Sequence, residues 1–262
     1  VVDRFKQRGA VFVDSVEDRP QGAPLLYSAH GLSPTVRRPA AQRGLRTVDA
    51  TCPLVTKVHD EAIRCAESGA TIILIGHAGH DEVVGTMGEA PERMRLVQSV
   101  EEADEVVVED GSRVAYLTQT TLSVDDAKRI IDHLRRRFPE IVGPPKDDIC
   151  YATQHRQEAV KKLAPQADLV LVVGSRNSSN SLRLAELARA CGVRAHLIDG
   201  PDDIDWAWFS GEETVVITAG ASAPEDVVMH CVDLLRERFQ ATVENVRFRD
   251  ERVHFRLPPE VR

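Results

Sequence analysis

The sequence predicts an α/β protein built from three similar units, because two separate patterns recur along the chain. In the first pattern a cysteine opens a helix, a short apolar strand follows, and a glycine ends the strand. The spacing from Cys52 to Gly76 is identical to the spacing from Cys150 to Gly174. Two stretches of the chain therefore share one plan of helix, strand and loop.

The second pattern is a loop of small polar residues that leads from an apolar strand into a helix, and it occurs three times. The loops and helix starts read SAHGLSPTVRR, TQTTLSVDDAKRI and TAGASAPEDVVMH, after the strands PLLY, VAYL and VVIT. His30, Thr120 and Gly220 take the equivalent place and follow one another at similar intervals. The predicted units are an incomplete first unit, a second unit, and a third unit with a C-terminal tail: residues 1–51, 52–147 and 148–262.

Each element of these units has a local reason in the sequence. After Cys52, the residues Leu54, Val58 and Ala62 repeat at i, i+4, which predicts a helix with one apolar face. The runs TIILIG and LVLVVG are short, apolar and ended by glycine, which predicts buried strands. In the three polar loops, the sequences SP, SVDD and AP suit the first turn of a helix. Because parallel α/β sheets bind ligands at the carboxyl ends of their strands, we expect these loops to meet in one central cleft.

The composition is that of an ordinary globular protein and narrows the possible functions. The chain has 262 residues, of which 42% are hydrophobic and 28% charged, and its net charge is −8. A negative net charge disfavours general nucleic-acid binding, and the longest apolar runs are far too short to span a bilayer. The chain shows no secretory leader, and its odd number of cysteines, five, suits a reducing compartment. We expect a cytoplasmic protein that binds neither nucleic acid nor membrane.

The first unit is expected to continue upstream of residue 1. The chain has no initiator Met and opens within the helix-like run VVDRFKQRGA. Cys52 precedes Thr120 by almost the same spacing as Cys150 precedes Gly220. A comparable spacing before His30 predicts a third cysteine, outside the printed sequence.

The five cysteines fall into two groups. Cys65, Cys191 and Cys231 lie among apolar residues at helical spacing and are expected to be small core residues. Cys52 and Cys150 lie at loop-to-helix junctions, where the helix dipole and unpaired N–H groups stabilise a thiolate, although a buried structural cysteine also fits there. A structural zinc ion prefers close C-x-x-C pairs, which this sequence lacks. An iron–sulfur cluster accepts widely spaced thiolates, so the hypothesis is a cubane with one cysteine per unit and one open iron.

The polar loops carry the candidate binding residues. The sequences GHAGHDEVVGTMG, GSRNSSNS and TAGAS offer hydroxyls, amides, histidines and backbone N–H groups at helix starts, which favour an anionic ligand. His30 and His80 are candidates for holding its charge, and Glu82 is a candidate acid. Thr120 or Thr121 could form a hydrogen bond with a substrate hydroxyl. The remaining histidines without such a context are expected at helix surfaces or edges: His59, His133, His155, His196, His230 and His254.

Taken together, several motifs resemble one protein family. SAHG, DATCPLVTKVH, IGHAGHDEVVGTMG, LTQTTLSVDD, VVGSRNSSNSLRLAELA and TAGASAP resemble the 4-hydroxy-3-methylbut-2-enyl diphosphate reductase (LytB) family, in order along nearly the whole chain. The resemblance implies a cloverleaf of three α/β domains around a central iron–sulfur cluster. It also implies the last step of the methylerythritol phosphate pathway to isoprenoids. In that step the substrate loses its C4 hydroxyl by a two-electron, two-proton reduction, which gives isopentenyl and dimethylallyl diphosphate.

The resemblance also implies roles for individual residues, by matching motifs. Cys52 and Cys150 would be two of the three cysteine ligands of a 4Fe–4S cluster with one open iron. Glu82 would deliver protons, Thr120 would orient the substrate, and ferredoxin or flavodoxin would supply electrons. The remaining matched residues would hold the diphosphate: His30, His80, Ser178, Ser179, Asn180 and Ser222. The family's first cysteine ligand and one further histidine have no counterpart in the printed sequence.

Two other functions fit parts of the pattern. A clusterless α/β module, an inactive fragment, could hold a phosphorylated metabolite through the same serine, asparagine and histidine side chains. A zinc hydrolase could use His77, His80 and Asp81 as ligands. The H-x-x-H pair lies in a glycine loop rather than on a helix face, however, so its ligand geometry is not fixed.

Overall fold

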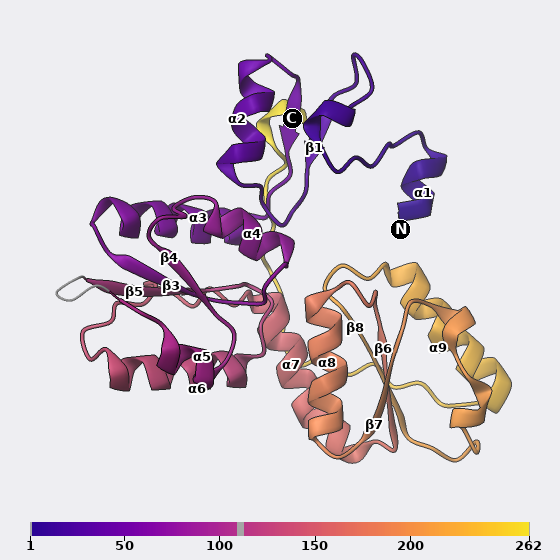
Figure 1. Cartoon of the computed structure of the whole chain (residues 1–262). Coiled ribbons are helices and arrows are strands. Elements are labelled where there is room, and N and C mark those ends of the chain that lie inside the picture. Colours follow the sequence, from indigo (N-terminus) through magenta and orange to yellow (C-terminus); the bar gives the residue numbers. More distant parts are fainter. Residues whose placement is uncertain (1, 109–112, 262) are drawn as a thin grey trace. The chain divides into compact units, whose positions relative to one another are not determined.

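The computed structural model describes residues 2–108 and 113–261, and it contains parallel sheets with helices packed on them (Figure 1). The chain divides into two compact units. Unit 1 comprises Val1–Thr120, Asp125–Asp148 and Val253–Arg262, whereas unit 2 comprises Thr121–Val124 and Ile149–Arg252. The α/β class predicted from the sequence is confirmed.

The first sheet of unit 1 has two parallel strands, β1 (Leu25–Tyr27) and β2 (Thr47–Asp49). The helix between them, α2 (Pro34–Gln42), has Ser33 as its N-cap and a proline in its first turn, as the sequence predicts. Proline is tolerated there because the first turn has no intrahelical partner for the missing N–H group. Two short helices precede β1: α1 (Val2–Gln7) and η1 (Val16–Asp18).

The second sheet of unit 1 has three parallel strands in the order β4–β3–β5. Its strands are β3 (Thr71–Ile75), β4 (Met94–Val97) and β5 (Val114–Thr118). The helices around it are α3 (Pro53–Glu67), α4 (Asp81–Met87), α5 (Val100–Glu105) and α6 (Val124–Arg137). Every residue of β3 is buried, because helices cover the central strand on both faces of the sheet. The strand therefore reads as a continuous apolar run rather than as an alternating one.

Unit 2 repeats this plan around a sheet of order β7–β6–β8. Its strands are β6 (Leu169–Val173), β7 (Arg194–Ile198) and β8 (Val215–Ala219). Its helices are α7 (Tyr151–Leu163), α8 (Ser179–Ala190) and α9 (Glu225–Phe239), with 3-10 turns at η2 (Ala164–Gln166), η3 (Pro201–Asp203) and η4 (Trp206–Trp208). Cys52 and Cys150 are the N-caps of α3 and α7, and Gly76 and Gly174 follow the central strands. The repeat predicted from the sequence is confirmed.

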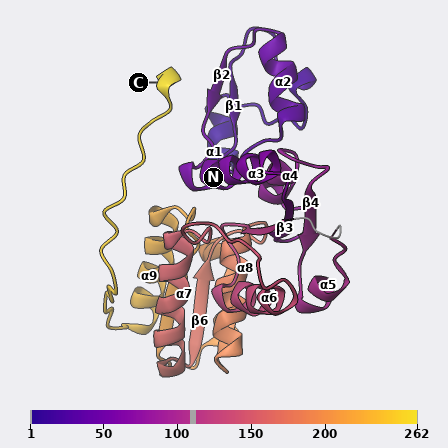
Figure 2. The same cartoon turned by 90° about the vertical axis from the view of Figure 1, so that its left-hand side faces the viewer.

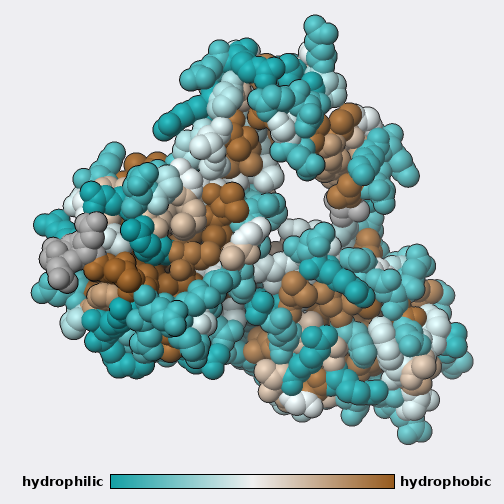
Figure 3. Space-filling model, viewed as in Figure 1, coloured by the Kyte–Doolittle hydropathy of each residue, from teal (hydrophilic) through white to brown (hydrophobic). Residues whose placement is uncertain are grey.

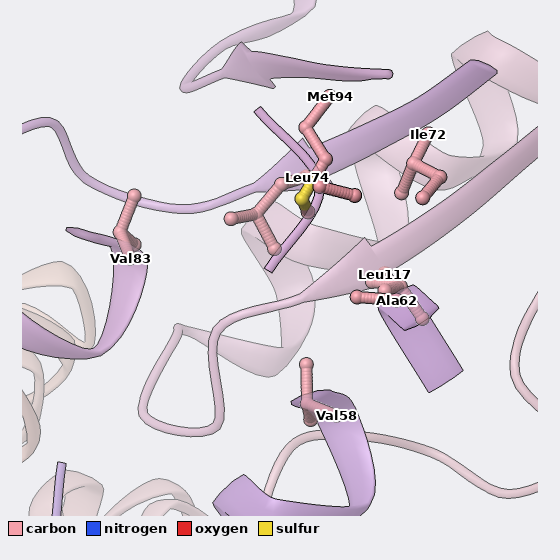
Figure 4. Packing of buried hydrophobic residues seen from close by; sticks show 8 residues of the cluster. Val58, Ala62, Ile72, Leu74, Val83, Met94 and Leu117 are labelled. Carbon is pink, nitrogen blue, oxygen red and sulfur yellow. The ribbon is translucent and has the colours of Figure 1, made fainter. Parts of the chain in front are cut away.

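The core of the second sheet is built from the i, i+4 face of α3. Val58 and Ala62 pack with Ile72 and Leu74 of β3 and with Leu117 of β5 (Figure 4). Full burial of a valine, leucine or isoleucine side chain contributes about 1.5–3 kcal/mol to stability. Of the three cysteines predicted as core residues, Cys231 is buried, whereas Cys65 and Cys191 are half-buried and pack against the edges of apolar clusters.

Up to residue 261, the C-terminal segment of the chain follows α9 without further strands. After α9, residues 241–258 form neither helix nor strand, as the long yellow segment in Figure 2 shows. The chain then enters η5 (Pro259–Val261), which contacts β2. Hydrophilic side chains cover much of the face drawn in Figure 3. Within the described residues, no helix is both long and apolar enough to cross a bilayer. The boundaries 1–51, 52–147 and 148–262 stay a prediction.

Candidate active site

The two cysteines predicted as cluster ligands each take the N-cap position of a helix. Cys52 is half-buried at the start of α3, and its amide donates to the carbonyl of Ala29 (3.0 Å). Cys150 is half-buried at the start of α7, where its Sγ accepts the N–H of Thr153 (3.3 Å) and its thiol contacts Thr153 Oγ1 (3.0 Å). Both thiols are free. An N-cap position at a helix start suits a sulfur that ligates iron, and at Cys150 a backbone N–H already points at the sulfur.

A buried carboxyl group lies at the start of α4. Glu82 is the second residue of this helix, and its side chain points inward with an exposure of 1%. Its Oε1 accepts the N–H of Thr120 (2.6 Å) and its Oε2 accepts the Thr120 hydroxyl (2.9 Å). Burial nevertheless raises the pKa of Glu82 to about 7, against the lowering effect of these bonds. Glu82 can therefore hold and release a proton near neutral pH.

This pKa makes the stability of the protein depend on pH, and Glu82→Gln isolates the contribution. Below pH 4.5 the carboxyl is protonated in both the folded and the unfolded chain. Between pH 4.5 and 7 the unfolded chain loses this proton while the folded protein keeps it, and above pH 7 the folded protein carries a buried charge. The free energy of unfolding of the wild type therefore falls as the pH rises through this range. We expect the free energy of unfolding of Glu82→Gln, relative to wild type, to rise by about 2–3 kcal/mol between pH 5 and 8.5. Thermal unfolding of both proteins across this range measures it, and a constant difference would contradict the raised pKa.

The histidine before this carboxyl has a defined tautomer. His80 is the N-cap of α4, and its Nδ1 accepts the N–H of Glu82 (3.2 Å). Burial, followed by the nearby His30, lowers the pKa of His80, so its ring is neutral near pH 7. Since Nδ1 is an acceptor, the ring proton lies on Nε2, and that N–H is the donor left for an anion. The His30 ring lies edge-on to the His80 ring, with 5.6 Å between centroids.

The matching loop of unit 2 carries an asparagine with unsatisfied polar atoms. Ser178 is the N-cap of α8, and its Oγ accepts the N–H of Ser181 (3.3 Å). The hydroxyl of Ser179 donates to the carbonyl of Thr121 (3.4 Å). Asn180 is only 4% exposed, and neither its Oδ1 nor its Nδ2 has a hydrogen-bond partner among the described residues. A buried amide without partners costs about 1–3 kcal/mol, which indicates a position reserved for a ligand.

The repeat explains why Glu82 is satisfied and Asn180 is not. Glu82 follows Gly76 at the same spacing as Asn180 follows Gly174, and both are the second residue of their helix. The partner of Glu82 is Thr120, whereas the equivalent position in unit 2 is Gly220, which has no side chain to offer. A Cβ atom at Gly220 would lie 2.1 Å from the Oγ of Ser181 and is therefore excluded.

The structure thus brings together part of the predicted site within each unit. In unit 1 these residues are His30, His80, Glu82 and Thr120. In unit 2, Ser178 is the N-cap of α8, Ser179 and Asn180 are its first two residues, and Ser222 is in the turn before α9. Across residues 2–108 and 113–261, no three side chains of His, Cys, Asp or Glu lie close enough to hold a metal ion. The Nδ1 of His77, a candidate zinc ligand, instead contacts Gln119 Oε1 (3.2 Å).

The expectation that His59 lies at a helix surface or edge is wrong. Its side chain is buried in α3, and its Nδ1 lies 2.7 Å from Glu89 Oε1. Glu89 is also paired with Arg37 of α2. The sequence does contain a signal for the burial of His59, because His59 follows Val55 by one helical turn and lies on the same buried face of the helix.

The buried carboxyl of Glu82 has a pKa raised to about 7 and lies beside His80 on a loop after a parallel strand. Perturbed carboxyl groups at the carboxyl ends of parallel strands are typical of the functional sites of α/β enzymes. The family model described as "LytB protein" matches residues 1–236, and the chain belongs to this family. It is therefore an oxidoreductase, since the relatives described next are named as reductases.

Relatives and solved structures agree with this assignment. The 4-hydroxy-3-methylbut-2-enyl diphosphate reductase of Rhodopirellula baltica is 59% identical over 262 residues, which are all of this chain and 82% of the relative. The reductase 2 of Mycobacterium tuberculosis H37Rv is 54% identical over all of this chain and 78% of the relative. The structure of the E-1-hydroxy-2-methyl-but-2-enyl-4-diphosphate reductase from Plasmodium falciparum has a TM-score of 0.94 and 37% identity, covering 98% of this chain and 81% of that one. A second solved structure, of an (E)-4-hydroxy-3-methyl-but-2-enyl diphosphate reductase, has a TM-score of 0.62 and 30% identity over 90% and 83% of the two chains.

Proposed function

We propose that this protein reduces (E)-4-hydroxy-3-methylbut-2-enyl diphosphate to isopentenyl and dimethylallyl diphosphate, the last step of the methylerythritol phosphate pathway. The observation that carries the proposal is the carboxyl of Glu82, buried and held by Thr120, with a pKa raised to about 7. Reductive loss of a hydroxyl needs a proton donor of this kind. The names of the relatives favour this reaction over a clusterless binding module.

The diphosphate is bound by hydrogen-bond donors rather than by lysine or arginine. In unit 1 the donors are His30 and the Nε2–H of His80, which the capping bond at Nδ1 leaves available. In unit 2 the amide of Asn180 supplies a buried donor, supported by its lack of other partners in the described chain. The hydroxyls of three serines complete the set: Ser178, Ser179 and Ser222.

Glu82 and Thr120 serve the leaving hydroxyl. The reaction consumes two electrons and two protons, breaks the C4–O bond, and releases the oxygen as water. Protonated Glu82 supplies a proton towards that oxygen, so that water leaves instead of hydroxide. Thr120 holds the carboxyl through both its N–H and its hydroxyl group, and it orients the substrate through that arrangement.

Cys52 and Cys150 would hold a 4Fe–4S cluster, together with a third cysteine predicted upstream of the printed sequence. Their free thiols at helix starts support this role. When bound, such a cluster supplies electrons and, at an iron without a cysteine ligand, a Lewis acid for the substrate oxygen. We further propose ferredoxin or flavodoxin as electron donor and the cytoplasm as location, which the five free cysteines support.

Asn180→Ala tests the diphosphate site. The substitution removes a buried donor, so we expect the KM for the substrate and the Kd for inorganic diphosphate to rise about 10- to 100-fold. The same change removes an unsatisfied amide from the fold, so thermal stability without ligand is expected to stay equal or to increase. Asn177→Ala, at an exposed asparagine of the same loop, is the matched control and should change neither quantity. Unchanged binding in Asn180→Ala would remove this residue from the site.

A further inference from the structure

The loop that carries His30 is pressed against α4. A Cβ atom at Gly85 of α4 would lie 2.9 Å from the carbonyl oxygen of Gly31, and one at Gly88 would lie 2.3 Å from the Cβ of Ser33. Only glycine allows the helix backbone to approach the loop this closely. One side of the His30 loop is therefore fixed by the helix that carries Glu82.

The ring of His59 is a second neighbour of the same loop. A Cβ atom at Gly31 would lie 2.9 Å from His59 Cε1 and 3.0 Å from its Nε2, so the ring edge lies directly against the Gly31 backbone. Gly31 has a φ of +78°, a conformation that favours glycine, and it immediately follows His30. The position of His30 thus depends on where the His59 ring lies.

A closed set of contacts holds the His59 ring in place. The Nδ1 of His59 lies 2.7 Å from Glu89 Oε1, and Glu89 is paired with Arg37. The Nε of Arg37 donates to the carbonyl of Leu32 (2.9 Å), which is the residue after Gly31 in the loop. Glu89 is almost fully buried and already paired with a guanidinium group, so it does not require a charged histidine. Burial lowers the pKa of His59 more than Glu89 raises it, so the neutral ring donates Nδ1–H to the carboxylate.

The ring edge that faces Gly31 is otherwise unused. His59 Nε2 is buried and has no hydrogen-bond partner among the described residues. The hydrogen bond to Glu89 uses only Nδ1 and does not explain why the other edge of the His59 ring lies against Gly31. The contact between that edge and Gly31 therefore requires an explanation beyond the ion pair.

We propose that His59 is a positioning residue, whose ring packs against the Gly31 backbone and so sets the place of His30 relative to His80. This inference rests on the proposed role of His30 in holding the diphosphate. His59 does not contact the substrate, and its influence passes through the loop. Its loss therefore weakens binding of the diphosphate and leaves the proton transfer from Glu82 unaffected.

Two substitutions separate the ring edge from the hydrogen bond. In His59→Asn the side-chain amide can keep the bond to Glu89, but the ring edge against Gly31 is lost. In His59→Phe the ring edge stays, but the Nδ1–H donor is lost, while Glu89 keeps Arg37. We expect His59→Asn to raise the substrate KM and the Kd for inorganic diphosphate about tenfold with kcat within about twofold of wild type, and His59→Phe to restore most of that affinity.

Controls distinguish support of the loop from general loosening. Val58→Ala, in the same helix and in the core cluster but not against the loop, should lower thermal stability without raising KM. If His59→Asn does not fold, Gly31→Ala disturbs the same contact from the loop side and should raise KM in the same way. The inference is overturned if His59→Asn or Gly31→Ala leaves KM unchanged, or if Val58→Ala raises KM equally. It is also overturned if His59→Phe raises KM while His59→Asn does not.

His30→Ala separates failure of this inference from failure of the proposed function. If His30→Ala weakens diphosphate binding and His59→Asn does not, His30 binds the substrate without depending on His59. If His30→Ala leaves the Kd for inorganic diphosphate unchanged, the assignment of the diphosphate site itself is wrong.

Discussion

Glu82→Gln is expected to lower kcat about 100-fold or more and to leave the iron content of the protein at the wild-type level. Glutamine has the shape of glutamate and can still accept the N–H of Thr120, so the start of α4 should keep its structure. It cannot donate an acidic proton near neutral pH, and general acid catalysis typically contributes 10²–10⁴-fold to the rate. Because Glu82 serves the leaving hydroxyl rather than the diphosphate, KM should change far less than kcat.

The measurement is a steady-state assay without oxygen on the full-length protein, with iron quantified in the same samples. Glu92→Gln, which neutralises an exposed carboxylate just beyond α4, is the matched control and should retain wild-type kcat. If Glu82→Gln keeps its turnover, Glu82 is not the proton donor. If it loses iron together with activity, the experiment reports a structural effect instead, and the role in proton transfer is not supported.

Cys52→Ala and Cys150→Ala are each expected to abolish the iron–sulfur cluster and, with it, the activity. Full-length wild-type protein purified without oxygen should be brown and hold about four irons per chain, if a cubane is bound. Removal of one thiolate from a set of three leaves too few ligands to hold such a cluster, so both iron and turnover should fall to background. The two cysteines occupy equivalent positions in the repeat, so the two variants should behave alike.

Cys65→Ala is the matched control, because Cys65 lies in α3, the helix that Cys52 caps, but packs against the core. It should keep its iron and its colour and lose only some stability. Iron content equal to wild type in either Cys52→Ala or Cys150→Ala would remove that residue from the ligand set. Loss of iron in Cys65→Ala would show that the cluster is sensitive to any disturbance of α3.

The repeat made much of the fold predictable from sequence. The spacing of Cys52 to Gly76, matched by that of Cys150 to Gly174, located two helix starts and the ends of two central strands, and the structure has them there. Such local features depend on nearest neighbours along the chain, such as proline in a first turn or a glycine after a strand.

Long-range contacts were not predictable in the same way. The bonds from Thr120 to Glu82 join residues 38 positions apart, and only the fold reveals that Thr120 is committed to the carboxyl. The burial of His59 follows from its spacing to Val55, but its pairing with Glu89, beyond a strand and a helix, is visible only in the fold. The unsatisfied amide of Asn180 likewise became meaningful only when its burial was known.

Turnover of the substrate tests the central claim most directly. Full-length protein, prepared without oxygen and supplied with a strong chemical reductant, is incubated with (E)-4-hydroxy-3-methylbut-2-enyl diphosphate, and the products are analysed by mass spectrometry. We predict formation of isopentenyl and dimethylallyl diphosphate, with loss of one oxygen from each substrate molecule. Binding of the substrate by iron-loaded protein without its consumption would contradict the claim and leave a diphosphate-binding module in its place.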